Sequence, residues 1–248
     1  KNQLSFKVFI TTRGRGYWQR IMLVRRIHET LLTFVRKSSV TRHSKRHRVI
    51  KHKYVPTCKE PTVEEVNSLQ LFLDNHRKTL VITGAGLSTE SGIQDYRSED
   101  VGLYARKNYK PMQYQQFISS EALRQRYWAR SFVGWPGYSK ILPSDNHHML
   151  AKWENSDMIH WLITQNVDHL HIKAGSERVT ELHGTLYKTR CLSCSNVISR
   201  QDYQTQIKDL NPEWSVQTFE IATDGDVFLT DEQVKGFQVR LRLKIVLL

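Results

Sequence analysis

The chain has 248 residues, with 37 Lys and Arg against 24 Asp and Glu, and its formal net charge is +13. Residues 1–60 hold 16 of the basic and 2 of the acidic side chains, so the remaining residues carry 21 basic and 22 acidic ones and are nearly neutral. Binding to nucleic acid needs a basic face on the folded domain, so this distribution argues against nucleic acid as a partner. No run approaches the roughly 20 apolar residues that span a bilayer, so we expect no membrane span.

Residues 1–60 form a basic amino-terminal arm. Between Tyr17 and Arg36, apolar residues recur at helical spacing, namely Ile21, Val24, Ile27, Leu31 and Val35. A segment rich in Arg and poor in acids is typical of a mitochondrial transit peptide, which predicts the mitochondrial matrix as the location. A disordered basic arm, or untranslated sequence read through by a gene model, is the alternative that the composition leaves open.

The globular part is expected over 61–239 and opens with a helix. Thr62 and Glu65 form a capping box, and the residues that follow give the helix an apolar stripe of Val66, Leu69, Phe72 and Leu73. Leu80 to Thr83 is then predicted as a short strand, of the kind that is covered on both faces in a parallel sheet.

This strand runs straight into a glycine-rich turn. Gly84 and Gly86 lack the Cβ atoms that would keep backbone amides away from a pyrophosphate, which favours a dinucleotide site. The match is partial, because the strict fingerprint would need glycine at Thr89. Taken alone, the turn is equally compatible with a tight connection that binds no ligand.

The next predicted elements follow in chain order. They are a helix over 120–133 that Trp135-Pro-Gly breaks, a short helix over 147–154, a second strand over 158–164 and a short helix over 169–174. Strands that alternate with helices predict an α/β fold with a parallel sheet, here an incomplete Rossmann-like sheet, because only two or three strands can be placed.

Two polar motifs follow the second strand, Thr164-Gln165-Asn166-Val167-Asp168 and Glu181-Leu182-His183-Gly184. In the order glycine turn, Gln-Asn-Val-Asp, Glu-Leu-His-Gly and Cys-x-x-Cys, the chain resembles the sirtuins, which are NAD-dependent protein-lysine deacylases, and within them class II. Segments 126–136 and 224–229 are similar to the mitochondrial sirtuin-four subtype. The resemblance runs from about Thr62 to Val239.

The resemblance implies NAD as cofactor and acylated-lysine proteins as substrates, with release of nicotinamide and O-acyl-ADP-ribose and with ADP-ribosyl transfer as a further activity. His183 would be the general base, because a neutral imidazole can accept a proton, and Asn166 and Asp168 would share the catalytic work. The implied NAD-binding residues are Gly84, Ala85, Gly86, Ser88, Thr89, Glu90, Gly92, Ile93, Asp95, Tyr96, Arg97, Tyr104, Gln165, Asn166, Val167 and Asp168. Gln94 stands where the family usually has proline, and Arg106 is a candidate contact for an acyl group.

The three cysteines are too few for a disulfide framework and fit a reducing compartment. Cys58 lies in the basic arm and is interpreted as incidental. Cys191 and Cys194 can supply two ligands of a tetrahedral zinc site, and the resemblance implies such a zinc module over 188–236. The 54 residues after Cys194 contain neither Cys nor His, so a partial site and a metal-free turn both remain open.

The final residues, 240–248, alternate basic and apolar side chains and could pair as a strand. They match nothing in the family at that place, so we expect the carboxy-terminal part of a sirtuin domain to be missing. Two alternatives to an active enzyme follow. One is a truncated, inactive sirtuin-like chain, and the other is a basic-arm binding protein whose globular part is incidental.

Overall fold

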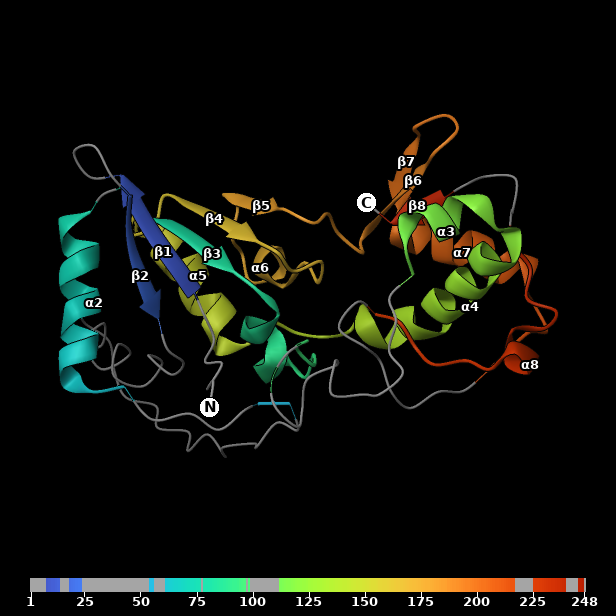
Figure 1. Ribbon diagram of the computed structural model, residues 1–248, viewed down its shortest axis with the longest axis horizontal. Helices are drawn as coiled ribbons and strands as arrows, with labels where there is room; N and C mark the ends of the chain where they lie inside the picture. Colours follow the sequence, from blue (N-terminus) through green and yellow to red (C-terminus); the bar gives the residue numbers. More distant parts are fainter. Residues whose placement is uncertain are drawn as a thin grey trace.

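The computed structural model describes residues 8–13, 18–23, 54–55, 61–76, 78–96, 98, 112–216, 225–239 and 245–247. These residues form two lobes that lie side by side (Figure 1). The sheet lobe contains α2, β1–β5, α5 and α6, and the helical lobe contains α3, α4, α7, α8 and β6–β8. No helix in the described ranges has the length and apolar character needed to cross a membrane.

The sheet lobe is built on a five-stranded sheet in the order β2-β1-β3-β4-β5. Strands β3, β4 and β5 are parallel, whereas β1 and β2 form an antiparallel hairpin that pairs with the other side of β3. The α/β fold with a parallel sheet is therefore confirmed. The strands are β1 (Val8–Arg13), β2 (Trp18–Leu23), β3 (Leu80–Thr83), β4 (Trp161–Thr164) and β5 (Val179–Glu181), and the helices are α2 (Val63–Asn75), the 3₁₀ helix η1 (Ala85–Ser91), α5 (Asp145–Asn155) and α6 (Leu170–Lys173).

Side chains of β3 and β4 alternate between a fully buried and a less buried face. Val81 and Leu162 belong to a core cluster with residues of α2 and α5, namely Leu69, Phe72, Leu73, Leu150 and Trp153. Leu80 and Ile82 point to the other face and are only half-buried. The strand is therefore covered most completely on the face of Val81, which the helices of this core cluster join, and less completely on the face of Leu80 and Ile82.

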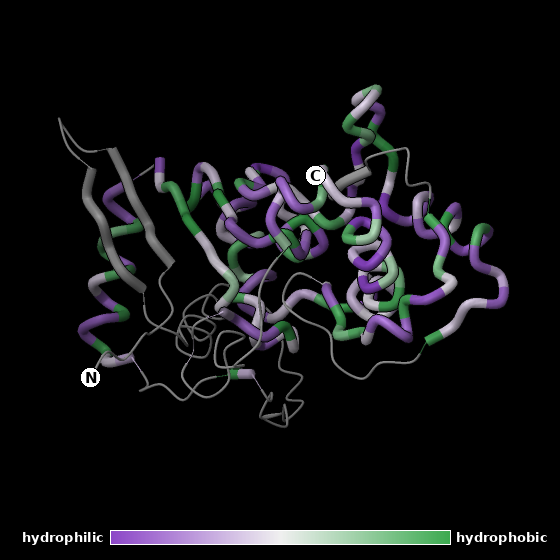
Figure 2. Tube along the Cα trace, turned by 45° about the vertical axis from the view of Figure 1, so that its right-hand side comes forward, coloured by the Kyte–Doolittle hydropathy of each residue, from purple (hydrophilic) through white to green (hydrophobic). Residues whose placement is uncertain are grey.

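Helix α2 begins as predicted. The Thr62 backbone N–H donates to Glu65 Oε2 at 2.8 Å, and the Glu65 N–H donates to Thr62 Oγ1 at 3.2 Å, which confirms the capping box. Figure 2 shows hydrophobic and hydrophilic residues alternating along this helix. Its hydrophobic face supplies three of the buried core residues, Leu69, Phe72 and Leu73.

The helical lobe pairs a helix bundle with a small three-stranded sheet in the order β7-β6-β8. Its core is aromatic and includes Phe117, Trp128, Tyr203 and Phe237. The described residues of 188–236, where a small module was predicted, lie here beside helices that come from earlier in the chain. The elements are α3 (Tyr114–Ser119), α4 (Glu121–Tyr138), β6 (Lys188–Cys191), β7 (Val197–Ser199), α7 (Arg200–Leu210), α8 (Asp231–Val234) and β8 (Ile245–Leu247).

Helix α4 continues through Pro136 to Tyr138, so the predicted break at Trp135 was wrong. Proline lacks the N–H that would bond to the carbonyl four residues earlier, which here is the carbonyl of Phe132. The Gln204 side-chain amide on α7 donates to that carbonyl at 2.9 Å instead. Tertiary contact thus satisfies the group that proline leaves open, and sequence alone could not show this.

Three other segments differ from their predicted form or extend it. Strand β4 starts at Trp161 rather than Met158, because the N–H groups of Met158 and Ile159 both donate to the Trp153 carbonyl and close a turn. Trp18–Leu23 is a strand, although it lies at the start of the segment with helical spacing, most of which falls outside the described residues. The possible strand in residues 240–248 is confirmed as β8, which pairs with β6.

The two lobes meet in an apolar junction cluster made of Ile93, Trp135, Tyr138, Leu170 and Leu186. Ile93 follows η1 and Leu170 opens α6, whereas Trp135 and Tyr138 lie at the end of α4. The helical lobe therefore packs directly against the loops that follow the parallel strands.

Candidate functional site

The three sequence motifs lie at the carboxyl ends of three neighbouring parallel strands. The glycine turn follows β3, Gln165–Asp168 follows β4, and Leu182–His183 follows β5. Backbone hydrogen bonds join the three exits, from Gln165 N to Thr83 O at 3.0 Å and from Leu182 N to Thr164 O at 2.8 Å. In open α/β sheets, ligands bind outside this edge.

The glycine turn is compact and open on one side. It continues as η1 and ends at Gly92, whose φ of +88° lies in the left-handed region that favours glycine. A Cβ atom built on Gly84 would meet no heavy atom of the described residues within 4 Å. Ala85, Gly86 and Thr89 lie in this turn, where the Thr89 hydroxyl donates to the Gly86 carbonyl at 3.1 Å. The backbone at Gly84 is therefore accessible to a ligand.

Ser88 joins the turn to the loop after β4. Its hydroxyl donates to Asp168 Oδ2 at 2.5 Å and accepts a hydrogen bond from Asn166 Nδ2 at 3.1 Å. Asn166 Nδ2 also donates to the Gly84 carbonyl at 3.1 Å. All three side chains are buried, so the structure brings Ser88, Asn166 and Asp168 into one polar network.

Asp168 sits in an environment that resists its ionisation. Burial raises the pKa of its carboxyl group above the ordinary value, and the hydrogen bonds from Ser88 and from the Leu170 N–H offset part of that rise. Those two donors hold both carboxylate oxygens in place, with the Leu170 N–H 3.0 Å from Oδ1. The carboxylate is thus oriented before any ligand arrives.

Two buried histidines lie beneath this network, and neither was predicted as a site residue. His147 Nδ1 accepts from the Ser144 N–H at 3.2 Å, so its proton is on Nε2, which lies 3.5 Å from Ser88 Oγ. His171 Nε2 lies 2.9 Å from Thr83 Oγ1. Burial lowers the pKa of His147 well below its usual range and lowers that of His171 to about 3, so both imidazoles are neutral. Their placement on the inner face of a helix is the signal that could have indicated them.

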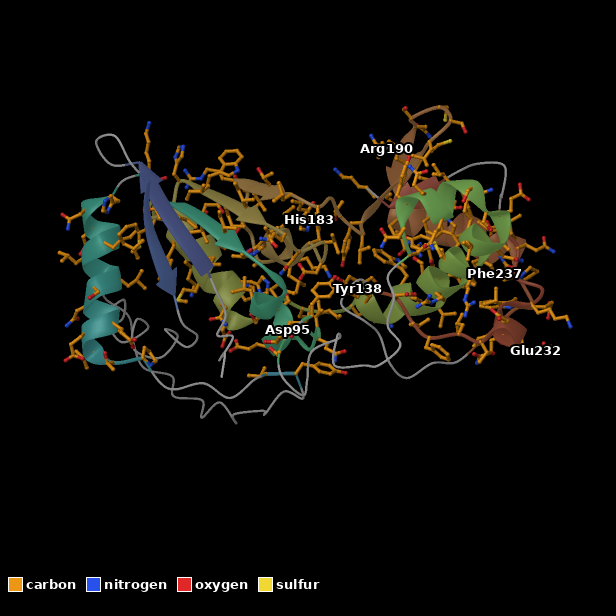
Figure 3. The ribbon with its side chains drawn as sticks, viewed as in Figure 1. Asp95, Tyr138, His183, Arg190, Glu232 and Phe237 are labelled. Carbon is orange, nitrogen blue, oxygen red and sulfur yellow. The ribbon has the colours of Figure 1, made fainter. Side chains whose placement is uncertain are left out.

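His183 differs from those two because it is exposed. Its Nδ1 lies 3.0 Å from the Gln165 carbonyl oxygen. Since a carbonyl can only accept, the proton is on Nδ1 and the lone pair is on Nε2. The described residues form no hydrogen bond to Nε2, which leaves it able to act as a base. Figure 3 places His183 on the side of the sheet lobe that faces the helical lobe.

The remaining predicted residues lie around the same edge with different partners. Asp95 caps its own turn, accepting from the Ser98 N–H at 3.0 Å and the Ser98 hydroxyl at 2.5 Å, and does not join the Asp168 network. Glu90 accepts from Asn146 Nδ2 at 2.8 Å. Gln94 is buried, Tyr96 is half-buried, and Ile93 and Val167 contribute to the junction cluster. Three predicted positions fall outside the described residues, and these are Arg97, Tyr104 and Arg106.

The Cys-x-x-Cys pair forms a tight turn in the helical lobe. The Ser195 N–H donates to the Cys191 carbonyl at 2.8 Å, and hydrogen bonds from the backbone of Cys194 and Ser193 lower the pKa of the Cys191 thiol. Both cysteines are free, with Cys191 buried and Cys194 exposed. In the described part of the chain, no group of three or more Cys, His, Asp or Glu side chains could hold a metal ion. These residues do not close a four-ligand zinc site.

Comparison with known proteins shows which family the chain matches. The Sir2 family model matches residues 84–246, well over half of the chain. Sirtuin-4 of Bos taurus, a mitochondrial NAD-dependent protein lipoamidase, is 51% identical over 75% of this chain and 59% of its own length. The NAD-dependent protein deacylase Sirt4 of Drosophila melanogaster is 47% identical over 76% of this chain and 61% of its own length. A solved structure of Sir2 with a p53 peptide and NAD⁺ is 32% identical, with a TM-score of 0.43, over 54% of this chain and 52% of that one.

The chain spans about three fifths of the length of these curated relatives, 59% and 61%. The matched region begins at the glycine turn and includes all three motifs at the sheet edge as well as the Cys-x-x-Cys turn. The chain therefore belongs to the Sir2 family.

Proposed function

We propose that the chain binds NAD at the carboxyl ends of β3, β4 and β5 and uses it to remove acyl groups from protein lysines. The observation that carries this proposal is the exposed His183, whose Nδ1–H donates to the Gln165 carbonyl and whose Nε2 is left able to accept a proton. Membership of the Sir2 family and the names of the two relatives, a protein lipoamidase and a protein deacylase, support it.

The residues at the sheet edge fit a dinucleotide. The open side of Gly84 would admit the pyrophosphate, and Gln165 and Asn166 would line the ribose. Asp168, oriented by Ser88 and Leu170, would accept a hydrogen bond from the nicotinamide amide. When bound, NAD supplies a glycosidic bond whose cleavage releases nicotinamide and leaves an electrophilic carbon for the acyl-lysine oxygen.

His183 would act as the general base that removes a proton from a ribose hydroxyl. The hydrogen bond to the Gln165 carbonyl fixes the orientation and the tautomer of the His183 ring. The ring would therefore not need to reorient during proton transfer. The buried His147 and His171 would not compete for that proton, because burial keeps the pKa of each far below its usual range. The buried His147 and His171 would therefore support the structure, whereas the exposed His183 would take part in the chemistry.

The proposed substrates are acylated-lysine proteins, and the proposed location is the mitochondrial matrix. The mitochondrial name of the Bos taurus relative and the basic composition of residues 1–60 both support this location. The nearly neutral composition of the remaining residues does not favour nucleic acid as a partner.

We propose only that the Cys191–Cys194 turn binds zinc weakly. Two thiolates can contact one ion, but a structural zinc site needs four ligands. No folding or catalytic role for zinc follows from these residues.

Nicotinamide release from NAD in the presence of an acyl-lysine peptide tests the function. His183→Ala should lower the rate about 10²- to 10⁴-fold, which is the usual cost of deleting a general base. His160→Ala is the matched control, because His160 is also exposed but precedes β4 at the opposite end of the sheet. A wild-type rate no higher than that of His183→Ala would contradict the proposal.

A further inference from the structure

His169 occupies a conformation that the turn after Asp168 requires. Its φ of +63° and ψ of 11° lie in the left-handed region, which few residues other than glycine adopt and in which histidine and asparagine are enriched. It immediately precedes α6, whose first N–H, from Leu170, donates to Asp168 Oδ1. Because Leu170 is adjacent to His169 in the chain, contacts that fix the position of His169 also help to fix the Asp168 carboxylate.

The His169 side chain reaches across to the next strand. Its Nδ1 lies 2.9 Å from Glu181 Oε1, and the two side chains are 22% and 17% exposed, so the pair is partly shielded from water. Glu181 is the last residue of β5 and lies two residues before His183. This contact joins the loop that carries Asp168 to the strand end that carries His183.

The other side of the imidazole stacks on Tyr187, with ring centroids 4.7 Å apart and planes 21° from parallel. Lys173 Nζ lies 5.1 Å from the Tyr187 ring centroid and is held by the carbonyls of Ser139 and Ile141. The edge of Trp135 meets the same ring at a centroid distance of 4.9 Å. The tyrosine ring is thus packed between several side chains and forms a platform for the imidazole.

The platform is anchored in the helical lobe by Arg200. Its backbone N–H donates to the Tyr187 carbonyl at 2.9 Å, and its guanidinium carbon lies 4.9 Å from the Trp135 ring centroid. The side chain of Arg200 is fully buried. A continuous series of contacts therefore runs from this arginine through Trp135, Tyr187 and His169 to Glu181.

Both members of this pair also affect the Asp168 carboxyl group. Burial is the main cause of the raised pKa of Asp168, to which the Glu181 carboxylate adds, whereas His169 opposes it. Loss of the His169 ring would therefore remove both a mechanical and an electrostatic support of the ionised Asp168.

We propose that His169 is a positioning residue whose imidazole, held between the Glu181 carboxylate and the Tyr187 ring, fixes the Asp168 turn relative to His183. This role rests on the proposed function, because it matters through the relative placement of those two groups. His169 itself touches neither cofactor nor substrate in this role.

His169→Gly tests the proposal with little change in backbone preference, since glycine adopts the left-handed conformation freely. We expect kcat for nicotinamide release to fall about tenfold, the cost of one charge-assisted hydrogen bond, with KM for NAD changed less than about threefold. His169→Asn, which tolerates the same conformation and keeps an N–H donor, should recover most of kcat. His160→Gly is the matched control and should change neither constant.

Wild-type kcat in His169→Gly would overturn the proposal, and so would a His169→Asn variant as slow as His169→Gly. If the glycine variant does not fold, Glu181→Ala removes the acceptor of the same hydrogen bond while leaving the residue in the left-handed conformation unchanged. If His169 had only a structural role, the substitution would lower the free energy of unfolding without lowering kcat selectively relative to KM.

Amide hydrogen exchange supplies a readout that does not depend on activity. Residues 167–170 and 181–186 should exchange about tenfold faster in His169→Gly, whereas the amides of β3 and β4 should keep their rates. Unchanged exchange in the two loops would overturn the positioning role. Absence of nicotinamide release by the unsubstituted chain would contradict the proposed function, and exchange alone would then decide the role of His169.

Discussion

The two lobes bury very different interiors. At its strand ends the sheet lobe buries a polar network that includes Ser88, Asn166 and Asp168, whereas the helical lobe buries large aromatic rings together with the cation of Arg200. Figure 3 shows the difference in position, with His183 and Asp95 on the sheet lobe and Phe237 in the helical lobe. Buried polar groups cost stability unless they are hydrogen-bonded, and a buried carboxyl with a raised pKa at the strand ends is a candidate for chemistry. The contrast indicates a reactive lobe and a supporting lobe.

The buried cation of the helical lobe fits the supporting role. Arg200 lies over the rings of Trp128 and Trp135, at 5.4 and 4.9 Å, and donates to Gln204 Oε1 and to Ser131. Its described partners include no carboxylate, and burial lowers its pKa to about 10, so it stays charged. The aromatic faces and neutral acceptors take the place of a counter-ion.

The largest expected effect on stability is therefore in the helical lobe. Arg200→Ala would leave a cavity between two indole rings and unpaired acceptors on Gln204 and Ser131, and should lower the free energy of unfolding by about 3 kcal/mol. Urea denaturation measures this change.

Arg190→Ala is its control, because Arg190 is an exposed arginine on β6 of the same lobe and should shift the free energy by no more than about 0.5 kcal/mol. If Arg200→Ala and Arg190→Ala lower the free energy of unfolding equally, the packing of Arg200 between Trp128 and Trp135 contributes no stability. The contrast between the two lobes would then be wrong.

A smaller effect, specific to the sheet lobe, depends on pH. Folding lowers the pKa of His171 from its ordinary value near 6.5 to about 3, so its contribution to stability is present above pH 6.5 and is lost as the pH falls toward 3. Between pH 7 and pH 5 this one group should lower the free energy of unfolding by about 2 kcal/mol. His171→Gln, which cannot titrate but can still bond to Thr83, should lose correspondingly less.

The difference between wild type and His171→Gln reports mainly this residue, because His147 and Asp168 are present in both proteins and burial, more than the neighbouring His171, lowers the pKa of His147. Urea midpoints at pH 7 and pH 5 give the comparison, with His160→Gln as the exposed control. Identical acid sensitivity in wild type and His171→Gln would mean that the buried imidazole is not the source of the pH dependence.

The sequence predicted the elements whose causes are local. The capping box at Thr62 and Glu65 depends on residues three apart, and the β3 strand and its glycine turn are contiguous in the chain. The order of the motifs predicted the family, and the parallel pairing of β3 and β4 follows from the alternation of strands and helices.

Features that depend on distant partners could not be predicted in this way. Pro136 stays inside α4 because Gln204, 68 positions away in sequence, bonds to the carbonyl that it frees. The pairing of His147 with Ser88 and of His171 with Thr83 also joins residues far apart in sequence. Periodicity indicates only that such histidines lie on the inner face of a helix, where they could equally be packed core residues with no role in a site.

The smallest expected effect concerns metal in the helical lobe. The sheet β7-β6-β8 is held by backbone pairing on both sides of β6. With two cysteine ligands, the chain should keep less than one equivalent of zinc after gel filtration, and a chelator should change the free energy of unfolding by less than about 1 kcal/mol. Metal analysis of wild type beside Cys191→Ser and Cys194→Ser makes the test. One full equivalent of zinc that survives dialysis, and that both substitutions abolish, would show that further ligands complete the site, and the helical lobe would then be stabilised by metal as well as by its aromatic core.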